Sequence, residues 1–110
     1  MFLKVKNIGG EVVKDNETYV LKDNKHLKNL VVSSTQLRPH QETRGHRHPG
    51  QEEVYYFISG TGKMQLNDNA PQDVGPGDVV LIEDGAFHKV YNTSEVDLYF
   101  VCVFDGKRNH

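Results

Sequence analysis

Short apolar runs separated by turn signals dominate the hydrophobic pattern of this chain, and helical periodicity is hard to find. Clusters of glycine, proline, asparagine and aspartate, such as Gly75-Pro76-Gly77, fall between the runs. The runs predict strands at 17–21, 30–37, 54–59, 62–66, 78–82, 89–91 and 97–104. Short strands with frequent turns indicate an all-β protein, either an antiparallel sandwich or a barrel.

Two of the predicted strands are apolar on both faces. Residues 79–82 have no polar alternate, and residues 98–104 form a continuous apolar run. One face of an antiparallel sheet is often solvated, so a strand that is apolar on both faces needs cover on its second face. A second sheet, an N-terminal arm or another subunit would provide that cover. We expect a homodimer formed through one outer face.

The 110 residues are enough for one domain, with residues 1–16 as an N-terminal arm or edge strand. The net charge of −2 predicts no general attraction to nucleic acid or to an anionic membrane. Lysines are frequent in the N-terminal third, but acidic residues are interspersed with them. That mixture is typical of a solvated surface.

A single cysteine, Cys102, excludes an intrachain disulfide and fits a reducing compartment. In an apolar strand such a cysteine is expected to pack as a small core residue. No run of about 18 apolar residues is present, and the N-terminus lacks an apolar signal core. These features predict a soluble cytoplasmic protein.

Three histidines and a carboxylate have spacings that suit one metal ion. His46 and His48 are two residues apart, so on a strand they share a face about 6–7 Å apart. The Pro49-Gly50 turn resets the phase before Glu52 and Glu53, and the spacing leaves open which of these two carboxylates is the ligand. A distant histidine, His88, follows a second turn.

Such a set would hold one divalent transition ion. Imidazole suits zinc, copper, iron and nickel, and a carboxylate adds tolerance for manganese, so iron, manganese, nickel and zinc are the candidates. Four protein ligands leave two positions of an octahedral ion open, which is typical of a catalytic site. The remaining histidines, His26, His40 and His110, lie outside the pattern.

The spacing resembles the two motifs of the cupin family. Gly45, His46 and His48, then Glu53 and Gly60, match the first motif, and Gly77, His88 and Asn92 match the second, with Glu83 where the family usually has proline. The resemblance implies a single cupin domain, a jelly-roll or double-stranded β-helix barrel of six to ten strands with the metal inside. It also implies that Glu53, six residues before Gly60, is the ligand, and that Glu52 is not.

A closer resemblance is to the cupin-type glucose-6-phosphate isomerases, through residues 43–48, 53–55 and 60–64. It implies that Thr43, Gly45 and Tyr55 line a sugar-phosphate pocket. Isomerisation then requires a base, for which Glu53 is the candidate, and a hydrogen-bond donor, for which Tyr55 is the candidate. For Tyr55 an ordinary place in the core is about equally consistent with the sequence.

Arg44 has the same parity as His46 and His48, so strict alternation turns it inward, where a guanidinium would suit a phosphate or carboxylate. The resemblance instead turns Thr43 and Gly45 inward. A β-bulge at Gly45 would reconcile the two.

Three hypotheses follow for the function. The protein is expected to bind or isomerise a small sugar or sugar phosphate at the metal, and an enzyme is favoured. The first alternative is a non-haem metal dioxygenase or related oxidoreductase, and the second is a non-catalytic metal and small-ligand binding module.

Overall fold

The structure is a computed structural model that describes residues 1–106. In this part of the chain all the regular elements are strands, and no helix is long and apolar enough to cross a membrane. The strands are β1 (Glu11–Asp15), β2 (Tyr19–Asn24), β3 (Leu30–Leu37), β4 (Glu53–Ser59), β5 (Gly62–Leu66), β6 (Gln72–Val74), β7 (Val79–Ile82), β8 (His88–Tyr91) and β9 (Leu98–Asp105).

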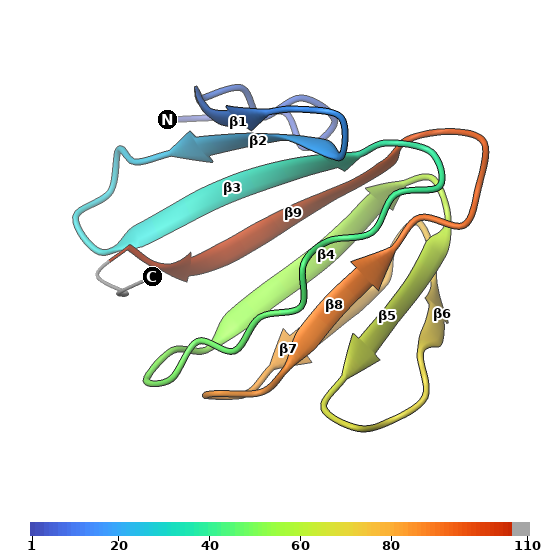
Figure 1. The fold of residues 1–110 in the computed structure, drawn as a ribbon. Coiled ribbons are helices and arrows are strands. Elements are labelled where there is room, and N and C mark those ends of the chain that lie inside the picture. Colours follow the sequence, from blue (N-terminus) through green and yellow to red (C-terminus); the bar gives the residue numbers. More distant parts are fainter. Residues whose placement is uncertain (107–110) are drawn as a thin grey trace.

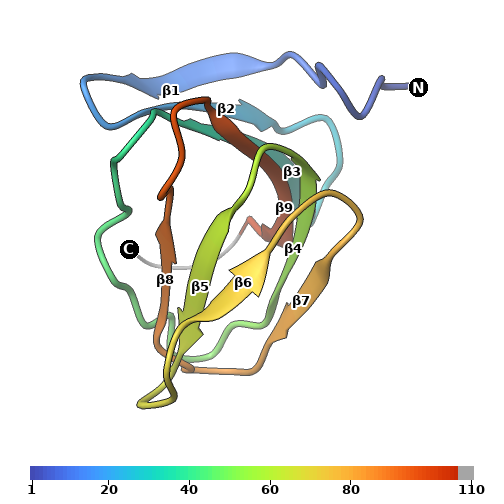
Figure 2. The same ribbon diagram turned by 90° about the vertical axis from the view of Figure 1, so that its right-hand side faces the viewer.

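The strands form two antiparallel sheets that face each other (Figures 1 and 2). The larger sheet has the order β1-β2-β3-β9-β4-β7, and the smaller has the order β6-β5-β8. Since β9 lies between β3 and β4, the last strand of the described residues joins two parts of the sheet that are distant in sequence. This arrangement is the jelly-roll barrel that the sequence predicts.

The core fills the space between the sheets. Phe57 and Phe100 lie at its centre, with ring centroids 5.1 Å apart, and Leu37 and Leu98 are fully buried beside them. Cys102 is 5% exposed and belongs to the same cluster, as expected of a small core residue.

Each predicted strand is present, with ends that differ by up to three residues. The largest difference is in β2, which begins two residues later than predicted and continues through the polar Lys22, Asp23 and Asn24. Strand β1 falls within residues 1–16, for which an arm or an edge strand was expected, and β6 was not predicted. Every residue of β1 is exposed, and β6 has only three residues, so neither shows the alternation of a half-buried strand.

The two strands that are apolar on both faces differ in how their outer faces are covered. On β9, Val101 is 7% exposed, and the Tyr99 hydroxyl accepts a hydrogen bond from the Ile8 amide at 3.4 Å. The N-terminal segment therefore covers part of β9. On β7, by contrast, Val79 is 57% exposed and Leu81 is 70% exposed. Within residues 1–106 nothing covers this second face.

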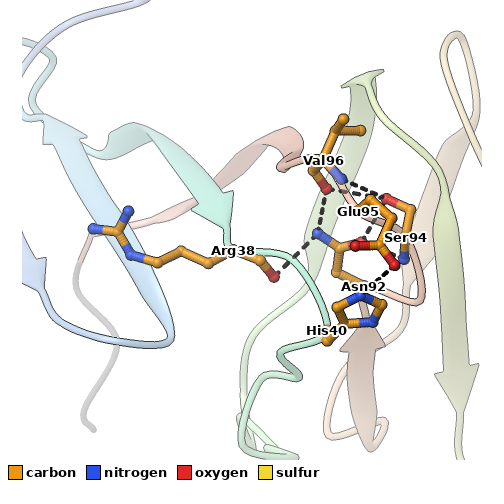
Figure 3. A network of polar contacts seen from close by, with 6 residues as sticks. All are labelled: Arg38, His40, Asn92, Ser94, Glu95 and Val96. Carbon is orange, nitrogen blue, oxygen red and sulfur yellow. Dashed lines mark hydrogen bonds and ion pairs between the residues drawn. The ribbon is translucent and has the colours of Figure 1, made fainter.

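The buried Asn92, directly after β8, links the end of β3 to the segment that precedes β9 (Figure 3). The Asn92 Nδ2 donates to the carbonyl oxygens of Leu37 at 2.9 Å, Arg38 at 3.1 Å and Val96 at 2.8 Å. Its Oδ1 accepts from the amide and the hydroxyl of Ser94, both at 2.9 Å. Asn92 therefore satisfies backbone groups that strand pairing leaves over.

Gly60 should tolerate a side chain less well than Gly50. Gly60 and Gly50 have the same φ of +82°. A Cβ on Gly60 would lie 2.3 Å from the Asp97 carbonyl oxygen, whereas a Cβ on Gly50 would have no neighbouring atom within 4 Å. We expect Gly50→Ala to cost about 1–2 kcal/mol and Gly60→Ala to cost on the order of 3 kcal/mol or more, because backbone must move. Denaturant unfolding of the two variants measures the difference, and equal costs would contradict the close packing of Gly60.

Candidate metal centre

A pair of backbone hydrogen bonds brings the two motifs together. The His46 amide donates to the His88 carbonyl at 3.1 Å, and the His88 amide donates to the His46 carbonyl at 2.9 Å. Residues paired in this way point to the same side of a sheet. The ring centroids of His46 and His88 are accordingly 6.4 Å apart.

Three side chains, including that of His88, converge next to this backbone pair. Ligand atoms of His48, Glu53 and His88 all lie within 4.8 Å of one another. The His48 Nε2 is 3.5 Å from the Glu53 Oε1, and Glu53 and His88 are only 4% and 3% exposed. Two imidazoles and a carboxylate gathered in so little space are a donor set that a divalent transition ion fits.

His46 lies at the exposed side of this cluster. Its ring stacks on that of His48, with centroids 5.6 Å apart and planes 15° apart. Its ligand atoms lie outside the group of three that meets the 4.8 Å limit. The structure thus brings four side chains together, three tightly and His46 beside them. Of the other histidines, His26 and His40 are exposed, and His110 lies outside the described residues.

The backbone fixes the orientation of the His88 ring. Its Nδ1 lies 3.1 Å from the Ala86 carbonyl oxygen, and a carbonyl only accepts, so Nδ1 carries the hydrogen. In the neutral ring Nε2 then has the lone pair that a metal ion binds. A backbone or carboxylate partner of this kind usually accompanies metal-binding histidines. The donor chemistry of the cluster therefore fits the ion that the sequence predicts.

The turn after His48 determines which glutamate points inward. The Gln51 amide donates to the His48 carbonyl at 3.1 Å, and the Gly50 amide donates to the Asp84 carboxylate at 2.6 Å. Beyond this turn, β4 starts with Glu53 on the buried side, whereas Glu52 is exposed. Asp84 thus ties the turn of the first motif to the turn of the second, and its role could not be inferred from spacing.

An extra residue in the segment before His46 changes which side chains face inward. Thr43 lies opposite Val90, whose carbonyl accepts from the Thr43 amide at 2.9 Å, while His46 lies opposite His88. From Thr43 to His46 the chain advances by three residues, while the opposite strand advances by two, from Val90 to His88. This extra residue is a β-bulge. The Val90 amide donates to the Thr43 hydroxyl at 2.9 Å, so this side chain replaces a backbone acceptor.

Gly45 and Arg44 lie within the bulge. A Cβ on Gly45 would lie 2.2 Å from the Phe87 ring, so Gly45 packs directly against that side chain. Arg44 is exposed and lines an open hollow of about 410 Å³, together with Asn16, Thr18, Tyr19, Glu42, Thr43, Gly45 and Lys89. In this hollow the hydrogen bond from Lys89 to Glu42 raises the pKa of the Lys89 ammonium.

Tyr55 lies next to the metal cluster. Its ring meets the edge of the His88 ring, with centroids 5.7 Å apart, and stacks on Phe100 at 5.2 Å. Tyr55 faces the interior two residues after Glu53 and is partly exposed. It therefore contacts both the core and the cluster.

Comparison with known proteins identifies the family. A model of the cupin domain matches residues 34–104, which contain both histidine motifs. The chain belongs to the cupin domain family. Among solved structures, a polyketide cyclase from Streptomyces resistomycificus has the same fold, with a TM-score of 0.82 and 19% identity, covering 100% of this chain and 82% of that one.

Three cupin relatives carry different functional names. An oxalate-binding protein from Thermotoga maritima is 29% identical over 86% of this chain and 78% of its own length. A 5-aminosalicylate 1,2-dioxygenase from Comamonas is 35% identical over 72% of this chain but 20% of its own length. A glucose-6-phosphate isomerase from Thermococcus kodakarensis is 27% identical over 86% of this chain and 56% of its own length. Family membership thus establishes the barrel and its common use of a metal, and leaves the substrate open.

Proposed function

We propose that this cupin binds a small hydroxyl-rich molecule of the sugar class at one divalent transition ion and isomerises it between aldose and ketose. In this proposal His46, His48, Glu53 and His88 hold the ion. A bound ion would supply Lewis acidity, polarising the oxygens of the ligand that occupies its open positions.

The observation that carries the proposal is a polar row on the inner face of the larger sheet. Strand register places Asp23, Ser33, Cys102 and Tyr55 side by side, one row from Glu53. Ser33 is 5% exposed, and Thr35, on the next row, is 4% exposed. Buried hydroxyl side chains add nothing to an apolar core. They would serve a polyol ligand, because each hydroxyl of a buried ligand requires a hydrogen-bond partner.

Charge on this wall favours a neutral sugar. The inward-facing positions of β2, β3, β4 and β9 include Asp23 and Glu53, and none of them is lysine or arginine. A phosphate would therefore depend on Arg44 and Lys89, at the hollow shared with Thr43, Gly45 and Tyr19. Tyr19 also packs against the core, so that hollow opens where the bulged segment meets the inner side of the sheet.

The chain supplies the groups that the reaction needs. Glu53 would take the proton from the carbon beside the carbonyl and return it to the neighbouring carbon. The Tyr55 hydroxyl would carry the proton that moves between the two oxygens. Aldose and ketose have the same atoms and electrons, so the step needs neither oxidant nor second substrate.

The test is proton exchange in heavy water. With the metal identified by elemental analysis, the loaded protein is incubated in D₂O with a panel of neutral aldoses, their phosphates and oxalate. We expect a neutral aldose to stabilise the folded protein and so to raise its melting temperature. At a concentration one hundred times Kd, the gain in folding free energy should be about 2.7 kcal/mol. Its C2 proton should exchange as ketose forms, and Tyr55→Phe should keep the binding and lose most of the exchange.

Each alternative gives a different result. Stabilisation without exchange would mean a non-catalytic binding module, as the name of the oxalate-binding relative suggests. Bound iron with substrate-dependent uptake of O₂ would mean an oxidoreductase, as in the dioxygenase relative. A response to sugar phosphates that Arg44→Gln removes would mean that the substrate is phosphorylated.

A further inference from the structure

The inner face of the larger sheet carries one acidic side chain that the metal cluster does not use. On β2, β3 and β9 the inward-facing positions are apolar or hold a hydroxyl or a thiol, with the single exception of Asp23. Asp23 is half-buried, and within residues 1–106 its carboxylate forms no hydrogen bond or ion pair. A carboxylate kept on the inside of a barrel without a protein partner is available to a ligand.

The strand partners of Asp23 add negative charge to its surroundings. Glu11 of β1 is the register partner on one side, and paired residues of an antiparallel sheet point to the same face. Ser33 of β3 is the partner on the other side. Lys22 has the opposite parity, Lys25 is exposed beyond the end of the strand, and in the described part of the chain neither forms an ion pair with Asp23. This end of the inner face is therefore acidic.

The backbone holds Asp23 in a fixed position. Its neighbour Asn24 is 8% exposed, and the Asn24 Nδ2 donates to the carbonyl oxygens of Gly9 at 3.2 Å and Val32 at 3.4 Å. A Cβ on Gly10 would lie 2.6 Å from the Asp23 carbonyl oxygen, so the chain that leads into β1 packs closely against this point. A group on so rigid a scaffold can discriminate between ligands, because it cannot move away from the wrong one.

The position of Asp23 relative to the metal cluster suits the far end of a bound sugar. Strands β3 and β9 separate β2 from β4, so Asp23 is three strand spacings, about 14 Å, from Glu53 across the sheet, and one row along it. The sheet curves around the interior, which shortens the direct path (Figure 2). In the proposed reaction the ion holds the oxygens of C1 and C2 of the sugar. The opposite end, C5 and C6, then extends past Ser33 toward Asp23.

We propose that Asp23 is a specificity-determining residue, which accepts a hydrogen bond from the terminal hydroxyl of a neutral hexose and excludes sugars with an anionic terminus. This inference rests on the proposed function, because it requires the other end of the sugar to be held at the ion. A hydroxyl that donates to a carboxylate forms a charge-assisted hydrogen bond. A terminal carboxylate or phosphate would instead meet Asp23 and Glu11 as like charges, a repulsion that a neutral sugar avoids. The substrate class is thus narrowed to hexoses with a free 6-hydroxyl.

Binding of matched sugars to the metal-loaded protein tests the role of Asp23. The probes are glucose, mannose and galactose, each compared by titration calorimetry with its 6-deoxy analogue and with its uronate. We expect one of these hexoses to bind about 10-fold more tightly than its 6-deoxy analogue and about 100-fold more tightly than its uronate. Asp23→Asn keeps the shape and removes the charge, so the preference over the uronate should fall below about 10-fold. The matched control is Asp68→Asn, the same change in an exposed turn, which should leave both preferences unchanged.

Three results would overturn this role of Asp23. The first is equal affinity of the wild-type protein for the hexose and its 6-deoxy analogue, a comparison that does not depend on the folding of a variant. The second is a preference over the uronate that persists in Asp23→Asn. The third is binding of none of the three hexoses. In that case a shorter aldose that binds and exchanges its C2 proton would leave the proposed function intact, whereas failure of every aldose to bind would overturn both.

Discussion

Replacing Glu53 with glutamine is expected to lower the affinity for the divalent ion by about 100-fold or more, while Glu52→Gln leaves it within about twofold. The two glutamates are neighbours in sequence, but only Glu53 is buried, 3.5 Å from the His48 Nε2. An amide keeps the size of the side chain and removes the negative charge that balances the ion. Metal content after dialysis and titration calorimetry of the metal-free proteins measure the effect.

The melting temperatures of the metal-free variants provide the control. Because both substitutions preserve shape, both metal-free proteins should fold, and the difference between them should appear only on addition of metal. A ligand that binds only the folded state stabilises it. Metal should therefore raise the melting temperatures of the wild-type protein and Glu52→Gln, and leave that of Glu53→Gln almost unchanged. Retention of metal by Glu53→Gln together with its loss in Glu52→Gln would reverse the register assigned to β4.

The sequence predicted most strands well because they are strongly patterned, whereas the choice of a jelly-roll barrel rested on the resemblance to cupins. Residues 98–104 and 30–37 are long and rich in β-branched and aromatic side chains, and both are central strands. The pattern left open whether residues 1–16 form an arm or an edge strand, since every residue of β1 is exposed and no buried face produces alternation. The end of β2 was also missed. Its last residue, Asn24, is polar, and it is buried by contacts with the N-terminal segment that a strand pattern does not show.

Within the site, spacing indicated which residues gather and not how the backbone orients them. Strict alternation would turn Arg44 to the side of His46, but the bulge between Thr43 and His46 shifts the phase. Its extra residue is visible only once the opposite strand is known. The Ala86 carbonyl that orients His88 is likewise a backbone group, and no side-chain motif marks it.

Strand β4 presents different residues on its two faces by alternation alone. Its inward residues Glu53 and Tyr55 lie at the candidate metal site, and its outward residues Val54 and Tyr56 lie on the exposed outer face of the sheet. A shift of one residue would exchange these roles. The hydrogen bond from the Gly50 amide to Asp84 therefore helps to determine both surfaces, since it fixes where β4 begins.

Asn92→Ala is expected to cost roughly 3–5 kcal/mol of folding stability, because each buried polar group left without a partner costs about 1–3 kcal/mol. The substitution removes the Asn92 donor from the Leu37 carbonyl and the Asn92 acceptor from the Ser94 amide, and Asn92 is only 2% exposed. A domain of this size has about 5–15 kcal/mol in total, so the variant should be close to unfolding at physiological temperature. Equilibrium denaturation in urea measures the loss.

The exposed ion pair in the same loop is the control. His40 and Glu95 lie 2.8 Å apart but are 56% and 87% exposed in their side chains (Figure 3), so Glu95→Gln should cost less than about 1 kcal/mol. A comparable loss in the two variants would mean that the loop, and not the Asn92 amide, is the sensitive feature.

Asn92→Asp separates hydrogen bonding from volume, because the carboxylate has the shape of the amide but cannot donate. A charged oxygen would face the carbonyls of Leu37, Arg38 and Val96, so this variant should be less stable than Asn92→Ala at neutral pH. Burial against carbonyl oxygens raises the pKa of the introduced carboxyl above the ordinary value of about 3.9. The folded state then binds more protons than the unfolded chain, so the penalty should diminish as the pH falls through the raised pKa. Asn92→Ala should lack this recovery, and a stability difference between the two variants that stays constant with pH would show that the amide does not act as the donor to these carbonyls.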